Sequence, residues 1–177
     1  GQRRFASRLI RLCLLAALSL CGAVAAVTAD TIRIATFNAE LTRKGPGLLL
    51  RDIIKGQDPQ FAAFTALMLD VRPDIIALQG IDYDLEHRAL TALTNALEKA
   101  GLAYPYTFTA APNAGQTSGL DLNGNGRLGD ADDAHGFGRY RGMGGMAVLS
   151  RFEILHEAVE EYTPCSGAIS TVISFRL

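Results

Sequence analysis

Apolar runs of strand length alternate with stretches of helical periodicity between residues 31 and 110, and this alternation constrains the fold more than any other feature. Residues 31–37 alternate apolar and polar side chains, and residues 74–80 form a short apolar run, so both predict strands. Between them, Asp58-Pro59 is typical of a helix start, because aspartate caps the first turn and proline fits its first position. The apolar residues that follow have helical spacing: Phe61, Phe64, Met68 and Val71. A strand, a helix and a strand in this order predict an α/β fold.

The same alternation continues along the chain. Residues 85–100 carry leucines on one helical face and stop before Gly101, which predicts a second helix. Strands are predicted over three later segments: 104–109, 146–150 and 153–159. The chain contains no internal repeat, and we expect residues 30–162 to form one α/β domain.

A polar segment rich in glycine, asparagine and aspartate separates the strands predicted at 104–109 and 146–150. Within it, residues 121–132 resemble the calcium loop of EF-hand and dockerin modules. Oxygen-bearing side chains occupy its first, third, fifth and twelfth positions: Asp121, Asn123, Asn125 and Asp132. Gly126, at the sixth position, would allow the sharp turn that wraps about six to eight oxygen ligands around Ca²⁺. The twelfth residue is the shorter aspartate and flanking helices are missing, so a turn-rich loop without calcium is the alternative.

Residues 1–29 have the layout of a secretory signal, with a basic opening, an apolar stretch from Leu12 to Val27 and small residues before Asp30. An uncleaved membrane anchor is the alternative, because the uncharged stretch from Leu12 to Ala29 is just long enough to span a bilayer. Its many small residues favour cleavage. We therefore predict a secreted or periplasmic protein that keeps no stable membrane span.

The charge of the chain bears on its partners. The formal net charge is −1, and removal of the four arginines in residues 1–29 would lower it to −5. Proteins that hold nucleic acid by neutralising its phosphates carry the opposite sign, so tight nonspecific binding of nucleic acid is disfavoured. After cleavage Cys165 would be the one remaining cysteine, which excludes an internal disulfide. Stability would then come from a packed core or from bound metal.

Three separated motifs carry the strongest functional signal: residues 34–40 (IATFNAE), 72–84 (RPDIIALQGIDYD) and 145–151 (GMAVLSR). Their order, spacing and wording resemble the endonuclease/exonuclease/phosphatase superfamily, in particular its exported bacterial members, over about residues 31–159. The resemblance implies the N-terminal part of a DNase I-like β-sandwich, in which two packed sheets are flanked by helices. It also implies metal-dependent hydrolysis of phosphate esters, in which Mg²⁺ or Mn²⁺ polarises the phosphoryl oxygens and a base activates water.

The resemblance assigns roles to individual residues. Asn38 and Glu40 match the family's first-strand amide and acid, which orient the phosphate or the metal; the alternative is a polar cap on a strand end. The family's metal-binding glutamate falls on Gly80, which has no side chain to coordinate with. Asp82 would stand in if the strand continues, since positions 80 and 82 share a face. The alternative is a turn in which Asp84 caps the next helix.

The family's later catalytic groups, an Asp/Asn pair and a terminal Asp-His pair, find no counterpart in the chain. None of the three histidines matches, and residues 163–177 depart from the family's wording as an atypical tail. We therefore expect residues 30–162 to be an incomplete domain of this family. Two functions stay open: an exported metal-dependent phosphoesterase that is weak or inactive as this chain, and a non-catalytic calcium-binding secreted module on the same fold. The phosphate-ester substrate is not identified, and nucleic acid stays within the family's range.

Overall fold

The computed structural model of the chain describes residues 31–162 and 170–176. The predicted signal and most of the predicted tail therefore lie outside the described residues. The chain divides into two units, residues 1–31 and 32–177, and the fold below is that of the second. In the described part of the chain, no helix combines the length and the apolar character that crossing a membrane requires.

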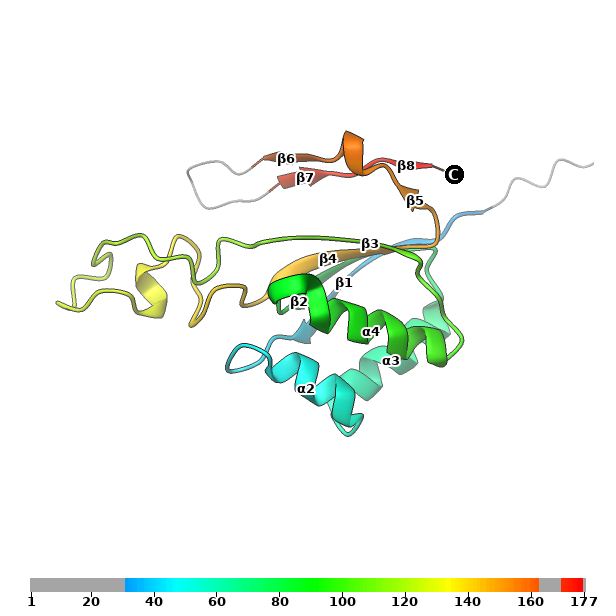
Figure 1. Cartoon of the computed structure of the whole chain (residues 1–177), viewed down its shortest axis with the longest axis horizontal. Helices are drawn as coiled ribbons and strands as arrows, with labels where there is room; N and C mark the ends of the chain where they lie inside the picture. Colours follow the sequence, from blue (N-terminus) through cyan, green and yellow to red (C-terminus); the bar gives the residue numbers. More distant parts are fainter. Residues whose placement is uncertain (1–30, 163–169, 177) are drawn as a thin grey trace, which may run out of the picture. The chain divides into compact units, whose positions relative to one another are not determined.

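A four-stranded mixed sheet forms the centre of the second unit (Figure 1). Its strands are β1 (Ile34–Leu41), β2 (Ile75–Ile81), β3 (Tyr106–Ala110) and β4 (Gly145–Ser150), in the spatial order β1-β2-β4-β3. β1 and β2 run parallel, and the helical connection between them allows this pairing. β4 runs antiparallel to both of its neighbours. The ends of β1 and β2 thus meet beside the start of β4.

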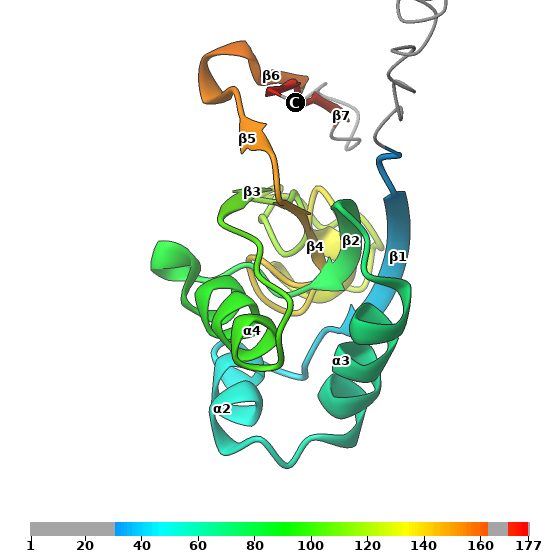
Figure 2. The same ribbon diagram turned by 90° about the vertical axis from the view of Figure 1, so that its right-hand side faces the viewer.

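Three helices cover one face of this sheet (Figures 1 and 2): α2 (Leu48–Lys55), α3 (Pro59–Val71) and α4 (Arg88–Lys99). α3 begins where the sequence predicts, because the Asp58 carboxylate accepts a hydrogen bond of 2.7 Å from the Phe61 N–H. The helices bury their apolar faces against strand residues such as Leu41, Leu78 and Leu149. Removal of this apolar surface from water is the main force that holds the helices on the sheet. The predicted α/β class is confirmed.

The helices differ from the sequence prediction in two places. The helix predicted at 85–100 begins at Arg88, because Glu86 and His87 have positive φ (61° and 54°) within the preceding 3-10 turn η1 (Leu85–His87). The sequence did not predict α2, which follows Gly47 in the left-handed conformation (φ 74°). α2 is a short helix, and burial of Leu49 and Ile53 against the core stabilises it more than local preference does.

The strand predicted at 153–159 is wrong as a single element. β5 (Glu153–Ile154) and β6 (Glu160–Tyr162) are separated by the 3-10 turn η3 (His156–Ala158). β5 pairs with β8 (Phe175–Arg176), and β6 pairs with β7 (Ser170–Val172), both antiparallel. The strand predicted at 31–37 also continues past Asn38 to Leu41, and this extension carries the candidate site.

Candidate functional site

A β-bulge lies where β1 and β2 end side by side. Their pairing is regular up to Asn38 and Gln79 and shifts in register after that pair, and β2 shifts against β4 at the same place. Glu40 (φ 51°) and Gly80 (φ 67°) both have a left-handed backbone there, which is readily adopted by glycine and unfavourable for glutamate. Bulges are frequent beside active sites, where they change the direction of a side chain.

The bulge borders an open groove of about 670 Å³. Its walls come from the ends of β1 and β2 and from the residue before β4: Asn38, Glu40, Thr42, Gln79, Gly80 and Gly144. The Thr42 hydroxyl donates to the Gly80 carbonyl at 3.3 Å, and Glu40 is exposed. The groove therefore brings together Asn38 and Glu40, the two residues that the sequence assigns to phosphate or metal.

The Asn38 side chain is oriented by the backbone of the bulge. Its Oδ1 accepts a hydrogen bond of 3.3 Å from the Glu40 N–H. A Cβ atom at Gly80 would lie 2.5 Å from the same oxygen, so the amide occupies space that any other residue at position 80 would fill. Since the oxygen faces the backbone, the Nδ2 donor is the group that Asn38 can offer to a ligand.

Asp82 is buried at the end of β2, with 6% of its surface exposed. Its Oδ2 accepts a hydrogen bond of 2.8 Å from the Arg43 N–H, and its Oδ1 accepts one of 3.1 Å from the Gly144 N–H. A role as metal ligand stays a prediction, and it would require the carboxylate to exchange one of these bonds for the ion. The alternative is a turn in which Asp84 caps the next helix. Both oxygens of Asp84 indeed accept from the Ala89 N–H in the first turn of α4, at 3.1–3.2 Å.

The residues of the groove do not fit a divalent cation by themselves. Gly80 stands where the family resemblance places an acid, and its backbone leaves no room for a side chain while Asn38 keeps its position. Within residues 31–162 and 170–176, no three His, Cys, Asp or Glu side chains are grouped as a metal site. Mg²⁺ requires near-octahedral oxygen coordination, and the groove offers Glu40 as its single carboxylate. No catalytic step is therefore assigned to a metal.

Arg43 follows the groove in sequence, and its guanidinium joins two acidic side chains. Its Nε lies 3.1 Å from Asp52 Oδ2, and its Nη2 lies 3.0 Å from Asp58 Oδ2, an ion pair without hydrogen-bond alignment. The Arg51 hydrogen bond, more than that from Arg43, lowers the pKa of Asp52, while burial opposes the shift. Since Asp52 lies in α2 and Asp58 caps α3, Arg43 fixes both helices to the loop that leaves β1.

Tyr140 ties the long polar segment to the same place. Its hydroxyl donates a hydrogen bond of 3.0 Å to the Arg43 carbonyl. Burial, and after it the Asp82 carboxylate, raises the pKa of Tyr140, so the hydroxyl stays protonated as a donor. Sequence reasoning missed both Arg43 and Tyr140, because the two residues are 97 positions apart and nothing in either neighbourhood marks the pairing.

The predicted calcium loop is closed by hydrogen bonds of its own. Asp121 accepts from the backbone N–H groups of Asn125 and Gly126 at 3.1 and 2.8 Å. The side-chain amides of Asn123 and Asn125 both donate to Asp130, at 3.3 and 2.7 Å. The structure thus brings two of the predicted ligands, Asn123 and Asn125, to an aspartate that the motif did not select, and Asp121 binds the backbone of the same turn. Occupancy by calcium stays a prediction.

The acidic end of this loop is organised by Asp133 rather than by Asp132. Asp133 is fully buried, and its two oxygens accept from the N–H groups of Leu122 and Gly129 at 2.8 and 3.1 Å. Asp132, the predicted twelfth-position ligand, is exposed within the 3-10 turn η2 (Ala131–Asp133). The sequence places several aspartates next to each other here, and motif spacing alone cannot tell which of them turns inward.

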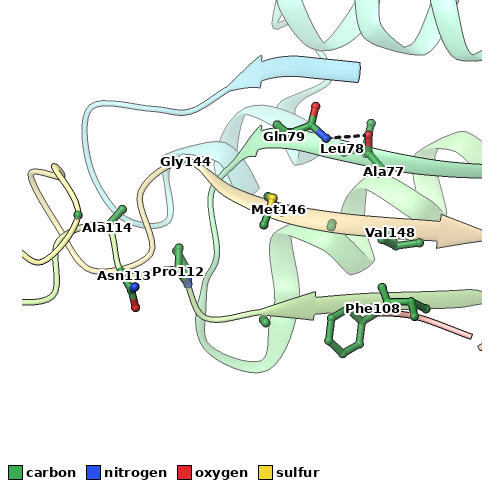
Figure 3. A pocket seen from close by; sticks show the side chains of 14 residues that line it. Ala77, Leu78, Gln79, Phe108, Pro112, Asn113, Ala114, Gly144, Met146 and Val148 are labelled. Carbon is green, nitrogen blue, oxygen red and sulfur yellow. Dashed lines mark hydrogen bonds between the residues drawn. The ribbon is translucent and has the colours of Figure 1, made fainter. Parts of the chain in front are cut away.

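An apolar groove of about 540 Å³ adjoins the polar one (Figure 3). Gln79 and Gly144 line both, and the apolar groove continues over Met146, Val148 and Phe108 on β4 and β3. Figure 3 shows the Gln79 amide turned along its own strand, where it donates to the Ala77 carbonyl at 3.2 Å. A ligand in the polar groove would therefore contact an apolar sheet surface on one side.

Comparison with known proteins gives two matches. The model of the Endonuclease/Exonuclease/phosphatase family matches residues 35–166. A solved structure, an endonuclease/exonuclease/phosphatase family protein from Leptotrichia buccalis C-1013-b, aligns with a TM-score of 0.40 and 17% sequence identity over 82% of this chain. The alignment covers 49% of that protein, so the chain spans about half its length. No curated protein shows significant similarity to the chain.

Proposed function

The chain belongs to the endonuclease/exonuclease/phosphatase family, and on this premise we propose that it is an exported, metal-dependent hydrolase of phosphate esters. Membership supports a phosphoesterase- or nuclease-type hydrolase, and members of the family generally use divalent metal ions. Export is supported by the layout of residues 1–29. N-terminal sequencing of protein from an exporting host tests it, with Asp30 as the expected first residue and an unprocessed chain as the contrary result.

The observation that carries the proposed reaction is the groove at the ends of β1 and β2. Asn38 presents its Nδ2 donor there, and Glu40 presents an exposed carboxylate two positions away. An amide N–H binds a phosphoryl oxygen and stabilises the negative charge that develops on it. A carboxylate beside a water molecule accepts the proton of that water as its oxygen bonds to phosphorus, while the ester P–O bond breaks and the alcohol or phenol oxygen leaves with its electron pair to solvent.

We expect turnover by this chain to be slow. Gly80 leaves the groove with one carboxylate, so a complete site for Mg²⁺ or Mn²⁺ would need ligands outside the described residues. Among phosphate esters, nucleic acid is the less favoured substrate, because a net charge of −1 supplies no excess of cations for its phosphates. A small chromogenic diester should therefore be cleaved at least as well as single-stranded DNA.

The test is turnover of bis(p-nitrophenyl) phosphate with Mg²⁺, Mn²⁺ or chelator, for the parent, Glu40→Gln and Glu98→Gln. Glu98 is an exposed glutamate of α4, so it controls for the change of charge. We expect low metal-dependent turnover that Glu40→Gln reduces by about 10²-fold, the range for loss of a general base, while Glu98→Gln keeps the parent rate. Turnover absent from the parent with every metal, or equal loss in both variants, would overturn the proposal.

A second candidate is a non-catalytic, calcium-binding secreted module. It is favoured by Gly80, which weakens the family site, and by the loop itself, in which Asn123 and Asn125 contact Asp130 and Asp121 binds the backbone of the same turn. Affinity for Ca²⁺ depends on the number of charged ligands, so calorimetry should record one site that Asp121→Ala removes. An absence of heat with the parent, or unchanged binding by the variant, would contradict this function.

A further inference from the structure

The Asp82 side chain bonds to both segments beside the groove, the loop leaving β1 and the residue before β4. We propose that Asp82 is a positioning residue: its carboxylate fastens the end of the 111–144 segment to the bulged ends of β1 and β2, and so fixes one wall of the substrate groove. The expected effect of Asp82 on substrate rests on the proposed function. The hydrogen bonds by which Asp82 holds the segment do not depend on it.

Each oxygen of Asp82 accepts a hydrogen bond from a different segment of the chain. Oδ1 accepts from the Gly144 N–H at 3.1 Å, and Gly144 lines the groove. Oδ2 accepts from the Arg43 N–H at 2.8 Å, and Arg43 directly follows Thr42, which also lines the groove. Bonds from N–H groups to a carboxylate are stronger than those to a neutral oxygen, more so where water is excluded. Asp82 is buried, so these two bonds hold the chain after Thr42 and the residue before β4 together where water is excluded.

Two further contacts hold the same segment. The Tyr83 N–H donates to the Gly142 carbonyl at 2.8 Å, and the Tyr140 hydroxyl donates to the Arg43 carbonyl at 3.0 Å. Gly142 lies so close to β2 that an added Cβ would be 2.3 Å from the Tyr83 carbonyl oxygen. Residues 140–144 are therefore attached at two points to the chain just after β2 and at one point to the loop that leaves β1. Figure 3 shows Gly144 where the long segment enters β4, next to the end of β2.

The geometry also explains why the carboxylate at position 82 holds the backbone and does not contact a ligand directly. A side chain at position 80 would press against the Asn38 amide and the Glu40 backbone, whereas the Asp82 carboxylate accepts hydrogen bonds from the N–H groups of Arg43 and Gly144. With those groups bound, Asp82 influences a ligand through the placement of Gly144 and of the chain after Thr42. It touches neither Asn38 nor Glu40 in the described hydrogen bonds.

The experiment compares Asp82→Asn with Asp84→Asn, the same chemical change two residues away on a carboxylate that caps α4. Amide exchange is followed residue by residue by NMR, together with kcat and KM for the chromogenic diester. Because an asparagine can accept only through one oxygen, Asp82→Asn should raise exchange at Gly144 or Arg43 by about 10-fold or more. It should lower kcat/KM, while Asp84→Asn raises exchange at the start of α4 and leaves residues 140–144 and kcat/KM unchanged.

Tyr140→Phe keeps the proposal testable if Asp82→Asn does not fold, since it removes one hydroxyl and should raise exchange over 140–144 by a smaller factor. Unchanged exchange at Gly144 and Arg43 in Asp82→Asn overturns the proposal, as does an equal rise in both aspartate variants. Loss of Mn²⁺ affinity in Asp82→Asn without altered exchange also overturns it, in favour of a metal ligand. If the parent shows no turnover while exchange changes as expected, the proposed hydrolysis fails and the fastening role stands.

Discussion

The groove at the ends of β1 and β2 and the loop at 121–133 contain the same kinds of residue and use them in opposite ways. In the loop, Asp121, Asp130 and Asp133 accept hydrogen bonds from neighbouring backbone or amide groups. In the groove, Asn38 binds the backbone through its oxygen and leaves its Nδ2 for a ligand, while Glu40 is exposed. The loop has the richer motif, and the groove has the polar groups that are still available.

This difference has a physical origin in the backbone. Aspartate and asparagine bind main-chain N–H groups within a few residues, so a glycine-rich segment satisfies them locally as turns. A bulge between paired strands keeps its backbone in the sheet and turns side chains away from it. A high density of acids and amides is therefore weaker evidence for a site than one amide and one acid that the local backbone does not satisfy.

The largest effect that would test this contrast is expected at Asp133. Replacement by alanine leaves the Leu122 and Gly129 N–H groups without their partner, which typically costs about 1–3 kcal/mol for each buried donor. We expect Asp133→Ala to lower the free energy of opening of the loop by about that amount, measured by amide exchange at Leu122 and Gly129. Asp132→Ala, at an exposed aspartate, should change it by less than about 0.5 kcal/mol. Equal effects of the two variants would show that the loop is not closed by Asp133.

A smaller effect is expected at the glycine of the bulge. Gly80→Ala places a Cβ 2.5 Å from Asn38 Oδ1 in a left-handed backbone, and the backbone strain alone costs roughly 1–2 kcal/mol. Gly129→Ala has the same strain (φ 85°) with nothing within 4 Å of the added atom. Urea unfolding should therefore show a greater loss of stability for Gly80→Ala, with the Asn38 amide resonances shifted in that variant alone. Equal losses and an unshifted amide would mean that Asn38 is not held over Gly80.

The sequence was sufficient for the framework and for part of the site. Helical spacing at Phe61, Phe64 and Met68 and the Asp58 cap depend on neighbours in sequence, and both were predicted. The family motifs also selected Asn38 and Glu40, which line one groove in the structure; their roles in binding phosphate or metal stay predictions. The environment of Asp82 could not be predicted, because its partners Arg43 and Gly144 are 39 and 62 positions away. The positive φ of Glu40 likewise arises at the bulge between β1 and β2. The residue pattern of a single strand does not reveal how that strand pairs with another.

The smallest expected effect is a pH dependence confined to the loop. Hydrogen bonds to Asp130, chiefly from the Asn125 amide at 2.7 Å, lower its pKa, with burial opposing them. A carboxyl group with a lowered pKa in the folded state stabilises that state above its unfolded pKa, and the contribution is lost as the pH falls through the folded value. After correction for the intrinsic exchange rate, amide exchange of residues 121–130 should therefore not depend on the ionisation of Asp130 near neutral pH. At a pH below the usual pKa range of aspartate, Asp130 becomes protonated and the exchange of these amides should become faster. Asp130→Asn should remove that acid-dependent step, and Asp132→Asn should retain it.

The groove serves as the control region in the same titration, because the side-chain hydrogen bonds of Asn38 and Thr42 do not involve Asp130. If amides 38–42 show an acid-dependent step that Asp130→Asn also removes, the two regions are coupled, and the contrast between a self-satisfied loop and an open groove does not hold.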